Sequence, residues 1–422
     1  MKFIMQVMVL ISTGLMGTIV FPQGNWNERV PMPTARKEIA NSTVTLNGKI
    51  YVVGGVASNG SITSVLEIYD PATNSWTEGP PLPIAVWRSS AAAANGKIYV
   101  FGGYRSLGPF PFNPTNRVFE YDPAGDSWEE KASMPNNRGA LTAAELNGNI
   151  HVLGGASSSA LTIHRVYDPQ ANDWSSAATI PTPRSGLTAA AYDGKIYVAG
   201  GYFLSGGVVP QNALEVYDPA TNGWEIKQNM PVARVGIDAV FVQGKMYVFG
   251  GTPNTPLSRT LEYDPATDNW EEMASMPSPV SFMGVATLND SIYVVGGGAV
   301  NLNRTDGLNV NRVYLPPGIA TAIDPVTGLP TQFELAQNFP NPFNPATTIQ
   351  YSLPQSTSIE LAIYNNRGQA IRTLFSGSQP SGVHFLVWDG KNNRGQDVAS
   401  GIYIYRLKSG RFLESKKMIL IR

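Results

Sequence analysis

Five arginines recur at nearly even spacing along the chain and could bind acidic ligands. They are Arg36, Arg88, Arg138, Arg184 and Arg234. A guanidinium group is planar and permanently charged, and it can hold a carboxylate through two parallel hydrogen bonds. If these side chains surround a common opening, they predict a binding site for an acidic group. The alternative is that they donate hydrogen bonds to backbone carbonyls between structural units.

Two carboxylates lie close to this series of arginines. Glu38 follows Arg36 by two residues, and Asp238 follows Arg234 by four. Carboxylates held near cations can carry out acid–base chemistry of the kind that a sugar isomerase needs. Glu38 and Asp238 are therefore the alternative catalytic residues, and ion-paired structural groups are the competing interpretation.

Aromatic residues lie in the segments next to these charges. They are Trp87, Phe110, Phe112, Tyr202 and Phe203. Exposed aromatic rings can stack on sugars or anchor a protein partner. We therefore add them to the predicted ligand-binding residues, with packing of long loops onto the protein's own rim as the alternative.

The composition excludes several other kinds of chemistry. The chain has no cysteine and only three histidines, so thiol nucleophiles, disulfides and thiolate metal sites are excluded. Neither a zinc spacing nor a phosphate-binding loop occurs. A net charge of −1 gives no electrostatic footprint for nucleic acid. We expect no metal, no cofactor and no nucleic-acid partner.

The candidate residues belong to a sequence repeat. Six Gly-Gly doublets lie 46 to 52 residues apart, each after an apolar run and before a Tyr-Asp-Pro segment or its degenerate copy. The doublets are Gly54-Gly55, Gly102-Gly103, Gly154-Gly155, Gly200-Gly201, Gly250-Gly251 and Gly296-Gly297. A period near 50 built from short β-type runs predicts a radial array of small sheets.

The order of apolar run, Gly-Gly, Tyr-Asp-Pro and Trp resembles the kelch repeat over residues 25–316. The resemblance implies an all-β fold, a six-bladed kelch β-propeller. It also implies arginines around the channel mouth that bind acidic ligands, and Pro183-Arg184-Ser185-Gly186 matches that pattern most closely.

Each unit is interpreted as four antiparallel strands, A to D. Strand A starts near the arginine, strand B ends at the doublet, strand C ends at Tyr-Asp-Pro and strand D carries the Trp. The D–A and B–C connections then emerge on one face, which we call the D–A/B–C face. Because these connections vary in length and the other turns do not, we expect binding on this face.

The first and last repeats are offset by one strand. Trp26 precedes the first doublet, whereas the last doublet is followed by Tyr314 but by no Trp. We therefore predict that a strand near Trp26 completes the sixth blade beside the strand that ends at Tyr314. Such a closure leaves no open sheet edge at the seam.

The N-terminal segment, residues 1–24, has the composition of an export signal. Lys2 is followed by an apolar stretch that runs to Phe21. We expect cleavage between Gly17 and Gly24. A retained membrane anchor is the alternative, and an uncleaved signal would be the only membrane contact.

The C-terminal part is predicted to be a separate small domain. Residues 317–332 read as a linker, and residues 333–422 as the domain. Ile359, Leu361 and Ile363 alternate with less apolar residues, which is typical of a strand buried on one face. About seven short strands in this length suit an immunoglobulin-like β-sandwich.

Short sequence segments of this domain carry a second resemblance. It opens with Asn338-Phe339-Pro340-Asn341-Pro342-Phe343-Asn344-Pro345 and later contains Gly401-Ile402-Tyr403. These segments resemble the C-terminal sorting domain of type IX secretion (Por system) substrates in Gram-negative bacteria. The resemblance implies that the secretion machinery recognises residues 333–422, with passage through the outer membrane, removal of the domain and attachment to the cell surface. An ordinary appended sandwich is the alternative.

The sequence thus predicts a secreted or surface-displayed protein, expected to be a monomer. Its predicted function is binding or adhesion, through recognition of an extracellular protein or polysaccharide by the D–A/B–C face. The alternative is a secreted enzyme that acts on acidic sugars, mutarotase-like or lyase-like.

Overall fold

The structure is a computed structural model that describes most of the chain from Gln23 onwards. The described residues are 23–108, 112–204, 207–253, 255–298, 306–318, 332–338, 341–345, 347–379 and 382–421. Every regular element among them is a β-strand, so the predicted all-β class is confirmed. None of these residues forms a helix long and apolar enough to cross a membrane.

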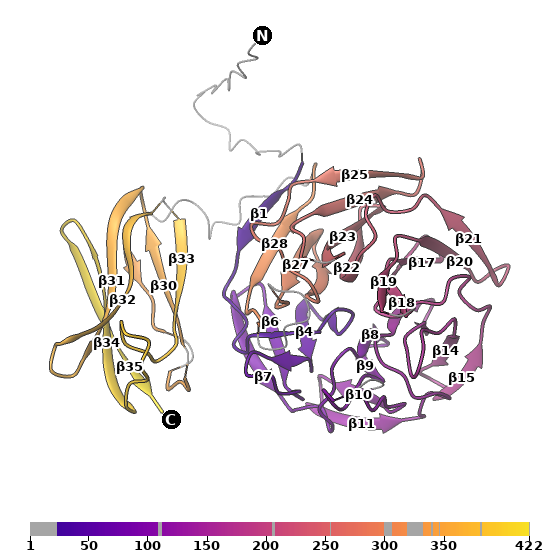
Figure 1. Cartoon of the computed structure of the whole chain (residues 1–422), viewed down its shortest axis with the longest axis horizontal. Helices are drawn as coiled ribbons and strands as arrows, with labels where there is room; N and C mark the ends of the chain where they lie inside the picture. Colours follow the sequence, from indigo (N-terminus) through magenta and orange to yellow (C-terminus); the bar gives the residue numbers. More distant parts are fainter. Residues whose placement is uncertain are drawn as a thin grey trace, which may run out of the picture.

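The first part of the chain forms a ring of six antiparallel sheets, each with four strands (Figure 1). Blades one and two contain β3 (Thr43–Leu46), β4 (Lys49–Val53), β6 (Leu66–Asp70) and β7 (Ser75–Gly79), then β8 (Ser90–Ala94), β9 (Lys97–Phe101), β10 (Val118–Asp122) and β11 (Ser127–Lys131). Blades three and four contain β12 (Thr142–Leu146), β13 (Asn149–Leu153), β14 (His164–Asp168) and β15 (Asp173–Ser176), then β16 (Thr188–Tyr192), β17 (Lys195–Ala199), β20 (Leu214–Asp218) and β21 (Gly223–Lys227). Blades five and six contain β22 (Val235–Val242), β23 (Lys245–Thr252), β24 (Thr260–Asp264) and β25 (Asn269–Met273), then β26 (Gly284–Leu288), β27 (Ser291–Val295), β28 (Asn311–Leu315) and β1 (Asn25–Glu28).

The hydrophobic core of the ring lies between adjacent blades. Strand B is buried on both of its faces, as in β4, where Ile50 to Val53 are all buried. Strand D lies at the outer rim, where polar residues alternate with the repeat tryptophan (Figure 1). The continuous apolar runs of the sequence are therefore the strands sandwiched between two neighbours.

The Gly-Gly doublets join neighbouring blades. In all six, the N–H of the second glycine donates to the carbonyl of the next blade's residue at the arginine position, at 2.9–3.2 Å. In blade three, Gly155 N donates to Arg184 O, and a Cβ on Gly154 would lie only 2.7 Å from that oxygen. Both glycines have positive φ, so the backbone geometry and the close approach each require glycine.

The repeat tryptophans also join neighbouring blades. Each indole Nε1 donates to a backbone carbonyl of the preceding blade, at 2.8–2.9 Å. The pairs are Trp26–Ala274, Trp76–Val30, Trp128–Pro80, Trp174–Ala132, Trp224–Ala178 and Trp270–Gln228. The ring is therefore closed by a hydrogen bond of the same type at every seam.

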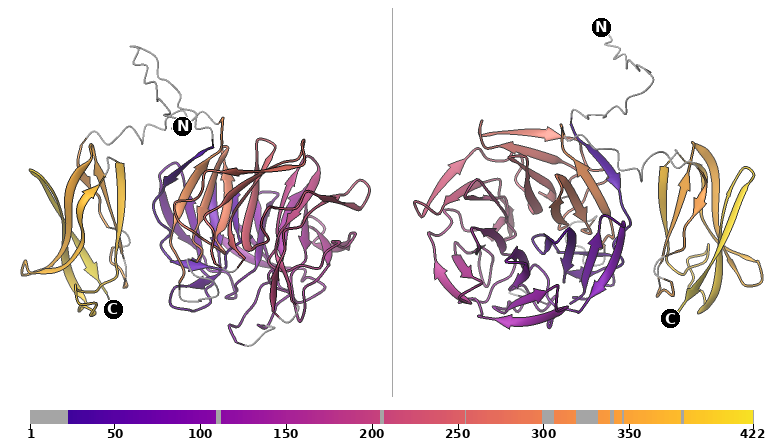
Figure 2. Two further views of the ribbon diagram at one scale, coloured as in Figure 1. Left: turned by 45° about the horizontal axis from the view of Figure 1, so that its top comes forward. Right: turned by 180° about the vertical axis from the view of Figure 1, so that it is seen from behind.

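The N-terminal strand completes the sixth blade. β1 pairs with β28, with Trp26 opposite Tyr314. The two rings lie 5.0 Å apart, and Trp26 Nε1 bonds to Ala274 O of blade five. Figure 2 shows the closed ring from two further directions.

Two short ladders extend the D–A/B–C face. β2 (Arg36–Lys37) pairs with β5 (Val56–Ala57) in blade one, and β18 (Tyr202–Leu204) pairs with β19 (Val208–Pro210) in blade four.

The C-terminal part forms two sheets that enclose one core. The strand orders are β29-β30-β33 and β32-β31-β34-β35. These strands are β29 (Glu334–Leu335), β30 (Thr347–Leu353), β31 (Thr357–Asn365), β32 (Ala370–Gln379), β33 (Gly382–Trp388), β34 (Gly401–Ser409) and β35 (Phe412–Leu420). Ile359, Leu361 and Ile363 point into the core with Trp388, as the alternation predicts.

Candidate functional site

Four of the five predicted ligand-binding arginines are buried inside the propeller, so the prediction is wrong for them. They are Arg36, Arg138, Arg184 and Arg234. In each, Nη1 donates to the carbonyl of the first glycine of the doublet in its own blade, at 2.9–3.0 Å. A buried carbonyl needs such a donor because water cannot reach it. The arginines therefore brace the fold, within one blade rather than between blades.

Within the described part of the chain, two of these arginines have carboxylate partners and two do not. The pairs are Arg36–Glu67 at 2.8 Å and Arg184–Glu215 at 2.6 Å. In blade three the residue equivalent to Glu67 and Glu215 is Arg165. Burial and the charge of Arg165 lower the pKa of Arg138 to about 9. In blade five, burial and then Arg259 lower the pKa of Arg234 to about 10. The carboxylates thus belong to the interior and mark no ligand site.

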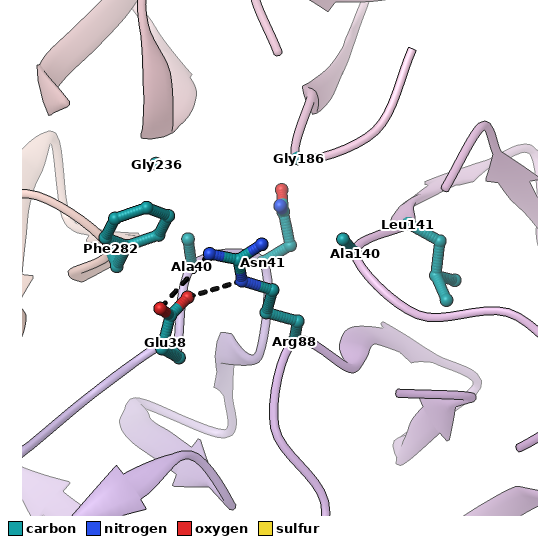
Figure 3. A pocket seen from close by; sticks show the side chains of 9 residues that line it. All are labelled: Glu38, Ala40, Asn41, Arg88, Ala140, Leu141, Gly186, Gly236 and Phe282. Atoms are coloured by element: carbon teal, nitrogen blue, oxygen red, sulfur yellow. Dashed lines mark hydrogen bonds and ion pairs between the residues drawn. The ribbon is translucent and has the colours of Figure 1, made fainter. Parts of the chain in front are cut away.

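Arg88 differs from the others and lies at the propeller axis. Val86 occupies the buried arginine position of blade two, and Arg88 follows two residues later. Its Nε lies 2.6 Å from Glu38 Oε2 and its Nη2 lies 3.2 Å from Oε1 (Figure 3). Its Nη1 donates to the Tyr202 hydroxyl at 3.1 Å, and the guanidinium lies over the Phe282 ring. Burial opposes the charge on Arg88, but Glu38, Tyr202 and Tyr104 together raise the pKa of Arg88 above its usual value.

Arg88 and Glu38 are members of a ring of equivalent residues, which we call the axial ring. Its members, one from each blade, are Glu38, Arg88, Ala140, Gly186, Gly236 and Phe282. All six have φ between 51° and 65°. Four of them donate their N–H to the carbonyl of the preceding member, at 2.7–3.2 Å. Aligning the repeats reveals this ring two residues after the arginine position, a signal that our sequence analysis did not use.

Asp238 is held deeper along the axis as a structural cross-link. Its Oδ1 accepts from Thr188 Oγ1 at 3.1 Å and Ala239 N at 2.9 Å. Its Oδ2 accepts from Asn41 N at 3.1 Å and Val285 N at 3.0 Å. Burial raises the pKa of Asp238 to about 6, although all four donors oppose that shift. With both oxygens occupied by donors from four blades, Asp238 does not serve as a base for a ligand.

The space beside Arg88 and Glu38 is small. The axial ring and three neighbouring residues line a pocket of about 20 Å³, which suits about one water molecule. Glu38 is only 5% exposed and paired with Arg88, so the alternative catalytic residues both have internal partners. The competing interpretation, ion-paired or hydrogen-bonded structural groups, describes them.

Trp87 and Phe112 form an aromatic cluster in the protein itself. Trp87 is 2% exposed, and its ring lies 5.2 Å from the rings of both Tyr104 and Phe112. The prediction that Trp87 offers its ring to a ligand is therefore wrong, because the long B–C loop folds back over it. Phe110 lies outside the described residues.

Tyr202 and Phe203 lie at the start of β18. Tyr202 is 6% exposed and uses its hydroxyl on Arg88, so it supports the axis and offers no stacking surface. Phe203 is half-buried on the β18–β19 hairpin, opposite Val209. Val208, on the second strand, is 48% exposed. Of the predicted aromatics that the structure describes, Phe203 keeps the strongest claim to a ligand contact.

Six four-stranded blades in a closed ring define a β-propeller. Residues 23–180 and 166–297 match the KLHDC2/KLHL20/DRC7 Kelch-repeats domain, and the chain therefore belongs to the kelch-repeat family. Residues 344–411 match the FlgD Ig-like domain, in agreement with the predicted sandwich. The predicted fold class is confirmed in both parts.

Curated relatives match over parts of the propeller. Kelch-like protein 35 of Mus musculus is 29% identical over 130 residues, which are 31% of this chain and 21% of that protein. Alpha-scruin of Limulus polyphemus is 28% identical over 137 residues, 32% and 15% of the two chains. Kelch-like protein terF of Aspergillus terreus is 26% identical over 177 residues, 36% and 38% of the two chains. The chain thus spans well under half of these relatives.

Among solved structures, that of YjhT is similar in fold. It superposes with a TM-score of 0.57 at 15% identity, over 67% of this chain and 95% of the other. At this identity the likeness supports the propeller architecture alone.

Proposed function

We propose that this protein is an exported binding protein whose kelch propeller recognises an extracellular protein or polysaccharide through the D–A/B–C face. The observation that carries the proposal is the internal pairing of the charged residues at the axis. Arg88 pairs with Glu38, and Asp238 accepts hydrogen bonds from Thr188 and Val285 of other blades, so we assign recognition to the loops around the opening. A rigid ring that presents variable loops is the usual architecture of a protein-binding module.

The β18–β19 hairpin is the best candidate for the contact surface within this face. Val208 is 48% exposed there, beside the half-buried Phe203. Short stretches of exposed apolar surface on a rigid ladder lose little entropy when they are covered by a partner. We therefore place the centre of the interface on this hairpin.

The proposal is tested with a pair of exposed-residue variants. The full chain would be screened on arrays of glycans and of extracellular proteins, and any ligand titrated by calorimetry. Val208→Asp should weaken binding by about tenfold or more, because it places a charge in the covered surface. Ile226→Asp is the matched control, since Ile226 is 72% exposed on strand D at the rim. Equal effects of the two substitutions would contradict the proposed surface.

We also propose that residues 1–24 are a signal peptide and that residues 333–422 direct type IX secretion and attachment to the outer surface of a Gram-negative cell. The resemblance of the two ends of the sequence to an export signal and a sorting domain supports this proposal. In a type IX-competent host, a chain lacking residues 333–422 should accumulate in the periplasm. Its appearance outside the cell in normal amounts would overturn the assignment.

A further inference from the structure

The outer face of the C-terminal sheet β32-β31-β34-β35 carries a hollow that belongs to neither the propeller nor the sandwich core. Glu360, Tyr364, Arg406, Lys408 and Leu413 line a space of about 250 Å³. They come from three adjacent strands and alternate with the residues that point into the core. The hollow is therefore a feature of the solvent side of the sheet.

The strand register explains why the sheet is hollowed there. Ala362, Arg406 and Ser415 form one row across β31, β34 and β35. The side chains on both sides of Arg406 in this row are small. Only the guanidinium of Arg406 therefore extends far from the surface of the sheet. The next row contains Glu360, Lys408 and Leu413, whose longer side chains form the wall.

Arg406 is held in place but keeps donors free. Its guanidinium lies 4.7 Å from the centre of the Tyr364 ring, and its Nε donates to Ser415 Oγ at 3.1 Å. These two contacts fix the plane of the fork and leave Nη1 and Nη2 without a recorded partner among the described residues. A fork held in this way loses little freedom when it binds a carboxylate.

Two further charged groups line the hollow, Glu360 and Lys408. Glu360 and Lys408 face each other in the register, yet neither makes an ion pair or a side-chain hydrogen bond within the described part of the chain. Leu413 beside them is 59% exposed. The surrounding domain is basic, with ten Lys or Arg against five Asp or Glu in residues 332–422.

We propose that this hollow binds an anionic glycan. The fork of Arg406 holds the acidic group of the sugar, Lys408 adds charge and a donor, and Leu413 covers the apolar face of the ring. Glu360 would repel a simple anion, but a carboxylate is a good acceptor for sugar hydroxyls. The combination of one acceptor with two cations therefore favours an acidic sugar over a bare phosphate. This site is independent of the propeller and of its proposed function.

The test uses the full chain and calorimetry with trigalacturonate, neutral galactotriose and a sulfated galactan oligomer. Arg406→Gln should lower the affinity for trigalacturonate about tenfold or more, because it removes the bidentate contact. Arg394→Gln is the matched control, since Arg394 is an exposed arginine in a loop of the same domain. Glu360→Gln should weaken trigalacturonate binding as well, whereas general charge attraction would strengthen it. Thermal melting of each variant checks that the domain is folded.

The outcomes separate this site from the propeller and from simple charge attraction. A selective loss in the Arg406 and Glu360 variants, with carboxylated and sulfated sugars bound more tightly than the neutral one, supports the proposal. The relative affinity of the two acidic sugars identifies the preferred group. Equal losses in the Arg394 and Arg406 variants, or no binding at millimolar concentration, would overturn it. Unchanged binding in Arg406→Gln would place any glycan site elsewhere in the chain and would also overturn it.

Discussion

At the scale of single residues, the propeller uses charged and polar groups mainly as internal braces. Arg184 satisfies Gly200 O and Ala213 O while it pairs with Glu215. Asp238 joins four blades through four donors. A buried polar group of this kind destabilises the fold unless all of its hydrogen-bond partners are in place. These groups therefore favour one arrangement of the blades.

The buried histidine pair of blade three predicts an acid-sensitive seam. His151 Nδ1 lies 2.9 Å from His164 Nε2, and His164 Nδ1 lies 3.0 Å from Ala178 O, the carbonyl that also accepts from Trp224 Nε1 of blade four. A carbonyl oxygen can only accept, so His164 Nδ1 donates to Ala178 O and His164 Nε2 is left as an acceptor for the N–H of His151. A proton on His164 Nε2 would oppose that N–H. Burial lowers the pKa of His151 to about 4 and, together with His151, that of His164 to about 3.

Because the folded pKa values lie below the unfolded value, the stabilisation is complete above about pH 6.5 and is lost as the pH falls. His151→Tyr installs the residue that the other five blades carry at this position. Between pH 6 and 4.5, the variant should lose about 1.4 kcal/mol less per pH unit than the unchanged chain. Urea unfolding midpoints measure this difference. His384→Gln, in the C-terminal domain, should leave the propeller's pH dependence unchanged, and parallel curves for His151→Tyr would contradict the prediction.

At the scale of elements, the doublet at the end of strand B decides how closely two blades approach. The first glycine lies against a carbonyl of the next blade and the second donates to that carbonyl. Glycine therefore recurs in the sequence at the positions where the backbones of two blades are in contact. In four of the A–B turns, by contrast, a Cβ on the glycine would meet nothing within 4 Å, so only the φ angle favours glycine there; these are Gly48, Gly96, Gly148 and Gly194.

Two glycines of blade three separate these two effects. Gly148 and Gly154 both have positive φ, but a Cβ on Gly148 meets nothing within 4 Å, whereas on Gly154 it would lie 2.7 Å from Arg184 O. Gly148→Ala should cost about 1–2 kcal/mol through backbone strain alone. Gly154→Ala should cost a further 1–3 kcal/mol, roughly, through overpacking at the seam. Urea unfolding of the two variants gives both values, and equal costs would show that close approach does not matter.

At the scale of the whole molecule, closure of the ring depends on β1. Its ladder to β28 and the Trp26 bond to Ala274 O join the beginning and the end of the propeller. A chain without residues 23–28 should melt at lower temperature, because it loses this ladder and a tryptophan contact of about 3–5 kcal/mol. It should also self-associate, since β28 becomes an open edge. Calorimetry measures the melting temperature and light scattering measures self-association. The melting temperature of Trp26→Ala should lie between those of the unchanged and the shortened chain. An unaltered melting temperature of the shortened chain would contradict the role of β1 in closure.

The sequence by itself determined the architecture of this protein. Six doublets at a regular period specify six blades, the offset of Trp26 and Tyr314 specifies the closing strand, and the alternation at Ile359 specifies a one-sided sheet. These patterns are local, because strand period and glycine backbone geometry are properties of short segments. Repeats also carry the positions of the axial ring, although that signal appears only when each repeat is aligned two residues past the arginine.

The tertiary structure alone decided what the candidate side chains do. Arg184 and Arg88 both lie near the start of strand A, yet the side chain of Arg184 runs back into its own blade and that of Arg88 points to the axis. Arg88 lies two residues after the arginine position that Val86 occupies in blade two. At Arg88 the backbone φ is positive, and that dihedral sets the direction of the side chain. Whether a carboxylate such as Glu38 or Asp238 is free depends on donors from several other blades, which no single repeat contains.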